Sequence, residues 1–172
     1  MVVHDATDKR LISEDTKLLL LEKAVVRARL DLETLKKELI EVYDKACIVR
    51  KDENINRLNQ ELHELNQTLK HFLRDWCNHN EWEETDLYPY AVWYFGEDPQ
   101  LFDYMEQDHK MAELYIHAFL QTLNRTTVPV SQKTARRMAS YLLQAYAFLK
   151  IKFKEEEDIL TALEDHSNRF HF

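Results

Sequence analysis

Apolar residues recur along most of this chain at alternating intervals of three and four positions, the spacing that places side chains on one face of an α-helix. Charged or imidazole-bearing residues interrupt each of the four stripes at positions that otherwise belong to a core. The stripes run through Leu11, Glu14, Leu18, Leu21, Val25, Ala28, Leu32, Leu35, Leu39 and Val42; Leu58, Leu62, Leu65, Leu69, Phe72, Trp76, His79 and Glu83; Phe102, Met105, His109, Ala112, Ile116, Phe119 and Leu123; and Met138, Leu142, Ala145, Leu149, Lys152, Glu156, Ile159 and Leu163.

The first two helices are separated by a polar turn. Ser13 is suited to cap the first helix, because its hydroxyl can accept from a free backbone N–H of the first turn. The first stripe continues to about residue 42 or 46. The polar segment 50–54 then predicts a turn, in which Asp52 or Asn54 caps the second helix.

Proline residues indicate where the later helices begin and end. Pro89 predicts that the second helix ends near Tyr88, since proline disrupts a helix interior. Asp98 as the N-cap and Pro99 at the first helical position predict the start of the third helix. Ser131 is placed to cap the fourth helix.

Short connections between four long amphipathic helices predict an all-α fold, an antiparallel up-down-up-down four-helix bundle. The chain has a single glycine and 45% hydrophobic residues, which also favours long helices over sheet. We expect one bundle over residues 13–164, with tails at 1–12 and 165–172.

The composition excludes several function classes. A formal net charge of −8 argues against nucleic acid and against an anionic membrane surface as partners. No segment has the roughly 18 consecutive apolar residues of a membrane span. Two cysteines far apart, Cys47 and Cys77, and an N-terminal segment without a signal-peptide pattern predict a cytoplasmic protein.

The interrupting residues are expected to meet at one level of the bundle. If the first turn centres near residue 49, His79 lies level with about residue 19 and Glu83 with about residue 15, close to Glu14. A second turn centred near residue 128 places His109 level with about residue 147, one to two turns from Lys152. The four stripes should therefore contribute to one buried polar site.

Two of these helices repeat the same pair of metal-ligand types. His79 and Glu83 lie one turn apart on one face, and His109 and Glu113 repeat that spacing on the next helix. Imidazole and carboxylate groups from different helices can hold iron or manganese in a bundle core. The expected metal ligands, enough for two ions, are His79, Glu83, His109, Glu113, Glu156 and Glu14.

The segment His79–Pro89, HNEWEETDLYP, resembles the second-helix signature HxxxEExxLFP of the hemerythrin-like (HHE cation-binding) family. The resemblance implies that His79 and Glu83 are iron ligands. The run EQDH ending at His109 is similar to the third-helix motif of the family, which implies His109 as a ligand and Glu113 as a second one. KFKEEEDIL, residues 152–160, resembles the fourth-helix motif and places Glu156 at its ligand position.

Two positions depart from the family pattern. Lys152 replaces the fourth-helix histidine, and Glu14 lies where the first-helix histidine is expected. An ammonium group has no lone pair, so Lys152 cannot bind a metal while protonated. Either a metal binds and Lys152 turns outward or pairs with a ligating carboxylate, or Lys152 is itself the cation that neutralises Glu83 or Glu156.

The resemblance implies a hemerythrin-like bundle with a non-haem, two-iron site that binds or senses oxygen, iron, nitric oxide or redox state. It implies a small diatomic ligand such as oxygen, no catalytic residues and no turnover of an organic substrate; a protein partner is compatible with it. Manganese or no metal are the other states of the site. The main alternative is a metal-free interaction or regulatory module with Lys152 as its internal cation. A ferritin-like di-iron oxidase ranks third, because the Glu-x-x-His spacing of that class is absent at these positions.

For some of these positions a structural role competes with a functional one. Glu14 falls in a first helical turn, where the helix dipole favours an acidic residue in any case. Glu113 lies one position off the strict stripe and is equally suited to a solvated surface.

Overall fold

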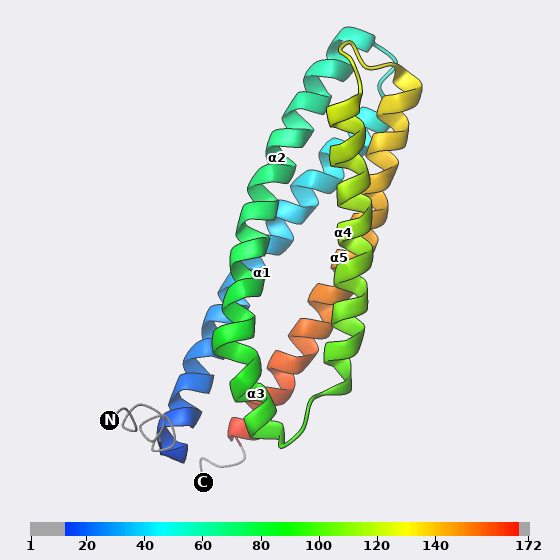
Figure 1. Cartoon of the computed structure of the whole chain (residues 1–172). Helices are drawn as coiled ribbons and strands as arrows, with labels where there is room; N and C mark the ends of the chain where they lie inside the picture. The colour runs from blue at the N-terminus through cyan, green and yellow to red at the C-terminus, as the bar shows by residue number, and fades with distance from the viewer. Residues whose placement is uncertain (1–12, 169–172) are drawn as a thin grey trace, which may run out of the picture.

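The computed structural model describes residues 13–168, and the side chains of residues 13–165 within them. Its helices are α1 (Glu14–Lys51), α2 (Ile55–Trp82), the π-helical segment η2 (Glu83–Leu87), α3 (Tyr88–Phe95), α4 (Gln100–Arg125) and α5 (Gln132–Asn168). Because α2, η2 and α3 follow one another without a break, they form one long helical rod, and the described chain is a bundle of four rods (Figure 1). The predicted all-α four-helix bundle is confirmed.

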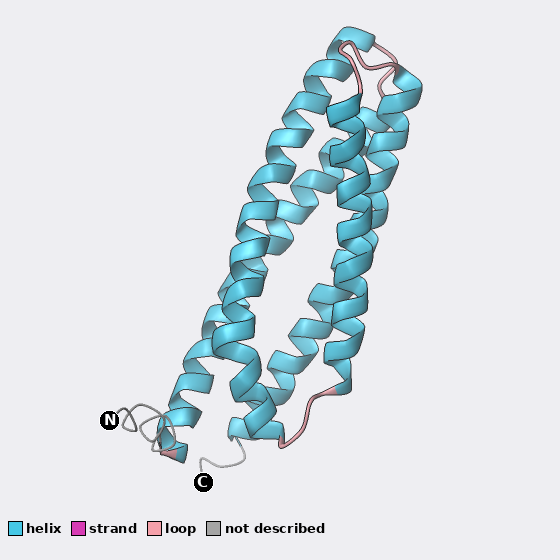
Figure 2. Ribbon diagram, viewed as in Figure 1, coloured by secondary structure: helices cyan, strands magenta, loops and turns pink. Residues whose placement is uncertain are grey.

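The rods run alternately up and down the long axis of the bundle. The α1–α2 and α4–α5 turns lie at one end, while the α3–α4 connection lies at the opposite end, beside the start of α1 and the end of α5 (Figures 1 and 2). α1 packs closely against α2 and α5, and α4 packs closely against α5. Between α2 and α4 there is a groove of about 700 Å³.

Three predicted caps are confirmed by their hydrogen bonds. The side chains of Ser13, Asn54 and Ser131 each accept from the backbone N–H three residues further on, at 3.1 to 3.2 Å. Asp52 ends α1 instead of capping α2, and its carboxylate pairs with Arg57 at 2.6 Å. Each cap satisfies a backbone donor that the first helical turn leaves free.

The third rod begins one residue later than predicted. Pro99 occupies the N-cap position of α4, and the helix begins at Gln100. The preceding helix α3 ends at Phe95 and is capped by Gly96, whose φ of 78° lies in the left-handed region that favours glycine.

The prediction that Pro89 ends the second helix is wrong. The rod passes through Pro89 because η2 loosens the helix just before it, and the N–H of Tyr88 donates to the carbonyl of Glu83, five residues back. Pro89 then lies in the first turn of α3, where the donor that proline lacks is not needed. The rod therefore extends seven residues past Tyr88, to Phe95.

The second and fourth apolar stripes are buried along their whole length, and the first and third are buried in part; Leu11 lies outside the described residues. In the second stripe all eight residues from Leu58 to Glu83 are buried, and so are all eight of the fourth stripe from Met138 to Leu163. Polar residues on these stripes, such as Lys152, are therefore buried with the leucines. No helix in the described part of the chain is both long and apolar enough to cross a membrane.

Truncating a core residue should destabilise the bundle far more than truncating a surface residue. Phe72 is fully buried, and Phe72→Ala should lower the free energy of unfolding by about 3–5 kcal/mol, measured by chemical denaturation. Leu30 is 61% exposed, and Leu30→Ala should change it by less than about 0.5 kcal/mol. Equal losses in the two variants would contradict this assignment of the core.

Candidate metal centre

Three ionisable side chains from two rods meet inside the bundle. His79 on α2, Glu83 at the start of η2 and Glu156 on α5 are exposed by 3%, 1% and 1%. The His79 Nε2 atom lies 2.7 Å from Glu156 Oε1 and 3.1 Å from Glu83 Oε1. One ligand atom from each residue lies within 4.8 Å of the others, which is compact enough for a shared ion. We call these three residues the buried triad.

The carboxylate of Asp31 on α1 contacts the second ring nitrogen of His79. Asp31 Oδ2 lies 3.0 Å from His79 Nδ1, on the side of the ring opposite the triad carboxylates. The sequence analysis missed Asp31 because it stands beside the stripe residue Leu32 and not on the stripe itself. Correct placement of the first turn would have pointed to this part of α1.

Glu14 does not belong to the site. It is exposed in the first turn of α1, 17 residues before Asp31, which is about 25 Å along a helix. The error came from the position of the turn: α1 extends to Lys51, so the hairpin centres near residue 53 and not near residue 49. A shift of about four residues in the centre moves the level opposite His79 by about eight residues toward Asp31.

Lys152 is buried, and its ammonium contacts Asn80 and His109 instead of pairing with a triad carboxylate. It is 4% exposed, and its Nζ atom lies 3.2 Å from Asn80 Oδ1 and 3.1 Å from His109 Nδ1. The same ammonium lies 5.2 Å from the centroid of the Trp76 ring, within range of a cation–π interaction. Among the described residues no ion pair joins Lys152 to Glu83 or Glu156.

His109 and Glu113 lie beside the triad but are not part of it. His109 is half-buried, and its Nε2 lies 2.8 Å from Glu113 Oε1 on the exposed side of α4. Its other ring nitrogen faces Lys152. The structure therefore brings together His79, Glu83 and Glu156, and it occupies both nitrogens of His109 with other partners.

The charges of the triad depend strongly on one another. Burial opposes protonation of His79, but its contacts with Glu156 and Glu83 outweigh burial and raise the pKa of His79 to about 10. Burial, together with the charge of Glu83, raises the pKa of Glu156 to about 8. Burial also disfavours the charge of Glu83, but its contacts with Glu156 and His79 outweigh this and lower its pKa. The triad thus holds protons that a bound cation would replace.

Three carboxylate oxygens of the triad lack hydrogen-bond donors. Both oxygens of Glu83 and Oε2 of Glu156 are buried, and no described residue donates a hydrogen bond to any of them. Buried carboxylate oxygens without a partner are costly, and a metal ion removes that cost by binding them directly. The donor set of one imidazole and two carboxylates suits iron or manganese. The residues present therefore fit one metal ion.

A cavity of about 430 Å³ gives access to the triad between η2 and α4. Glu83, His109 and Lys152 supply its polar wall, and Tyr88, Phe102 and Met105 form its apolar side. A molecule of a few atoms could reach the Glu83 carboxylate through this space.

Stability of the metal-free protein should fall as pH rises from about 6.5 to 9. His79 has a folded pKa of about 10 against an ordinary 6.5, and Glu156 has about 8 against 4.5. A group whose pKa is higher in the folded than in the unfolded protein contributes its full stabilisation below the unfolded pKa. This contribution to the free energy of unfolding is lost as the pH rises through the folded pKa. Thermal melts in the presence of a chelator would measure this, and His79→Gln should flatten the dependence. A melting temperature that rises over this range would contradict the assignment.

Comparison with known proteins identifies the family. The family model described as the hemerythrin HHE cation binding domain matches residues 33–163. This span includes the whole triad and Lys152 but begins just after Asp31. No curated protein and no solved structure matched the chain. The match covers most of the 172 residues, and the chain therefore belongs to the hemerythrin HHE cation-binding family.

Proposed function

We propose that this protein binds one redox-active metal ion, iron or alternatively manganese, through His79, Glu83 and Glu156. The observation that carries the proposal is the set of three buried oxygens, both of Glu83 and Oε2 of Glu156, to which no described residue donates a hydrogen bond. Lys152 does not fill this need, because its ammonium faces Asn80 and His109.

The donor set favours one ion over the two expected from the family pattern. A second ion would need further ligands on the α4 side of the cavity, where His109 is the nearest imidazole. Its Nδ1 faces the Lys152 ammonium at 3.1 Å and its Nε2 contacts Glu113. In our proposal the ammonium supplies the second positive charge of the site in place of a second metal.

Asp31 prepares His79 for this role. When Nδ1 donates its hydrogen to the Asp31 carboxylate at 3.0 Å, the lone pair is left on Nε2, which faces both triad carboxylates. A carboxylate behind a metal-binding histidine fixes the orientation of the ring and increases its basicity. Three rods, carrying Asp31, His79 and Glu156, would then hold the ion between them.

The second part of the proposal concerns a small ligand. A ferrous ion in such a site would offer open coordination positions to a diatomic molecule such as oxygen or nitric oxide. The cavity beside Glu83 would admit it, and Phe102 and Met105 would limit water. The Lys152 ammonium, buried at the edge of the same cavity, would favour a ligand that gains negative charge. Binding or sensing, without turnover of an organic substrate, is the role this arrangement supports.

Iron content of matched variants tests the proposal. Protein loaded anaerobically with ferrous iron should retain one ion per chain, and exposure to air should produce a near-ultraviolet charge-transfer band. Glu83→Gln removes a ligand charge and should weaken iron binding by at least about tenfold, the lower end of what loss of a supporting residue alone costs. Glu84→Gln, at the exposed neighbouring position, should leave binding unchanged.

The loading experiment has clear contrary results. An absence of bound iron together with no new absorption band would overturn the metal proposal. Two ions per chain would retain the metal but overturn the assignment of Lys152 as the second cation.

Burial of Lys152 favours one other candidate function, a metal-free interaction or regulatory module. At 4% exposure its ammonium is the internal cation that such a module would need to balance the triad. The ammonium, however, forms no ion pair with either carboxylate.

Comparison of Lys152→Ala with a chelator separates the two candidates. If iron is bound, a chelator should lower the melting temperature, since a ligand at about 100 times its Kd adds about 2.7 kcal/mol of stability. Lys152→Ala should then retain the iron. The metal-free module predicts no effect of the chelator and a loss of about 3–5 kcal/mol in Lys152→Ala. Lys154→Ala, at an exposed position two residues further on, is the control.

A further inference from the structure

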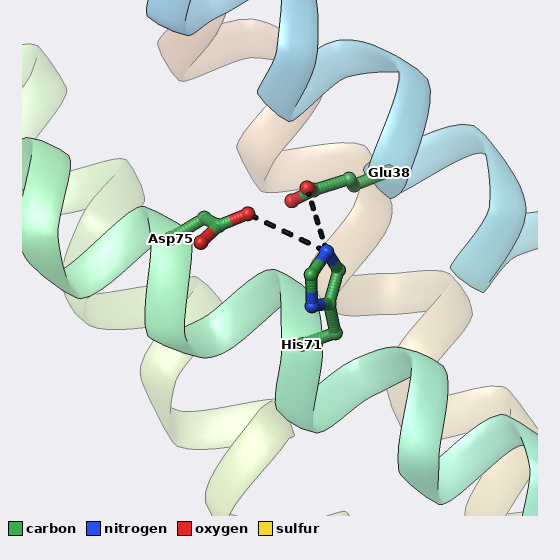
Figure 3. Close-up of side chains that lie close together, drawn as sticks. All are labelled: Glu38, His71 and Asp75. Atoms are coloured by element: carbon green, nitrogen blue, oxygen red, sulfur yellow. Dashed lines mark ion pairs between the residues drawn. The ribbon is translucent and has the colours of Figure 1, made fainter.

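A second group of metal-ligand side chains lies on the outside of the bundle, where α1 and α2 pack together. Figure 3 shows Glu38 from α1 facing His71 and Asp75, which lie one turn apart on α2. His71 Nε2 is 3.2 Å from Glu38 Oε1 and 3.6 Å from Asp75 Oδ2. One ligand atom from each of the three residues lies within 4.8 Å of the other two. We call these residues the outer triad.

The outer triad is separate from the buried one. His71 precedes His79 by eight residues, about 12 Å along α2, and the two groups share no residue. The His71 side chain is 55% exposed, whereas that of His79 is 2% exposed. An ion could reach the outer triad from solvent without any opening of the bundle.

Within the outer triad, Glu38 has a covered carboxylate oxygen that the packing of the bundle leaves without a hydrogen-bond donor. Its side chain is 13% exposed, and its Oε2 atom is covered and accepts no hydrogen bond from any described residue. Burial, a hydrogen bond with Asp75 and the charges of Asp75 and Glu41 raise the pKa of Glu38 to about 7, against the weaker opposing charge of Arg74. A carboxylate held beside other carboxylates has an electrostatic need for a cation.

We propose that Glu38, His71 and Asp75 bind a divalent metal ion of the zinc class. Zinc takes imidazole nitrogen and carboxylate oxygen at about 2.0–2.2 Å, so tetrahedral ligand atoms lie roughly 3.3–3.6 Å apart. The two separations measured from His71 Nε2 are close to that range. Three protein ligands would leave the fourth position to water, an open site on the protein surface.

Arg74 opposes the ion in the metal-free state. Its Nη2 lies 2.7 Å from His71 Nδ1, and its Nε lies 3.9 Å from Asp75 Oδ1. While Arg74 donates to Nδ1, the hydrogen of the neutral ring stays on Nε2, the atom that faces Glu38. Zinc at Nε2 therefore requires that the ring hydrogen move to Nδ1 and that the guanidinium move away. Loss of Arg74 should make the site bind more tightly.

Zinc titration of the full chain, followed by calorimetry and by the ring signals of histidines in NMR spectra, tests the proposal. Zinc should shift the His71 ring nitrogens, and His71→Ala should bind one fewer zinc ion per chain than the wild type. His63→Ala, which removes an exposed histidine elsewhere on α2, should bind as many as the wild type. Glu83→Gln should keep the His71 shifts, so failure of the buried centre and failure of the outer triad can be told apart.

Arg74 supplies the most specific arm of the experiment. Arg74→Ala should lower the Kd of the outer triad several-fold, and Arg137→Ala, which removes an exposed cation on α5, should not. The proposal is overturned if zinc leaves the His71 ring signals in place, or if His71→Ala keeps the wild-type number of ions. It is also overturned if Arg74→Ala binds no more tightly than Arg137→Ala, because the triad would then be only a surface network of ion pairs.

Discussion

The interior of this bundle depends on one imidazole ring that touches three of its rods. His79 joins Asp31 on α1 through Nδ1 and Glu156 on α5 through Nε2, while Glu83 follows on its own rod. Polar groups in a core must find partners, and these groups can do so only if the rods hold one particular register. The hydrogen bonds of the His79 ring therefore fix the register of the rods and, with it, the geometry of the candidate metal centre.

Helical periodicity explains which buried residues could be predicted from the sequence. Since side chains three and four apart share a helix face, the stripes identified His79, Glu83, Lys152 and Glu156 as buried residues, and all four are buried. The same reasoning could not find Asp31, because it stands at the side of its stripe and its role depends on which residue of α2 lies opposite. That pairing follows from the end of α1 at Lys51, a boundary that periodicity locates poorly.

The structure differs from the sequence-based prediction at Pro89 and at Lys152, and each difference has a local physical cause. Pro89 was a sound reason to end a helix, and the chain avoids its effect by widening one turn just before it. Lys152 suggested an ion pair with a triad carboxylate, since both occupy one stripe. A lysine has a long and flexible stem, however, and its ammonium reaches Asn80 and His109 instead. Spacing predicts the face on which a side chain begins but not where a long one ends.

The π-helical segment η2 changes the rotational phase of α3 relative to α2 within the same rod. A π turn amounts to one extra residue in an α-helix, so it shifts the rotational phase of everything that follows by about 100°. Glu83 begins this segment and Tyr88 follows it as the first residue of α3, so the two lie on either side of the phase shift. Tyr88, an α3 residue in the cavity wall, therefore faces a direction that an uninterrupted α-helix would not give it, while His79 keeps the phase of α2. The π-helical segment thus separates the rotational phase of the ligand-bearing α2 from that of α3, which closes this end of the bundle.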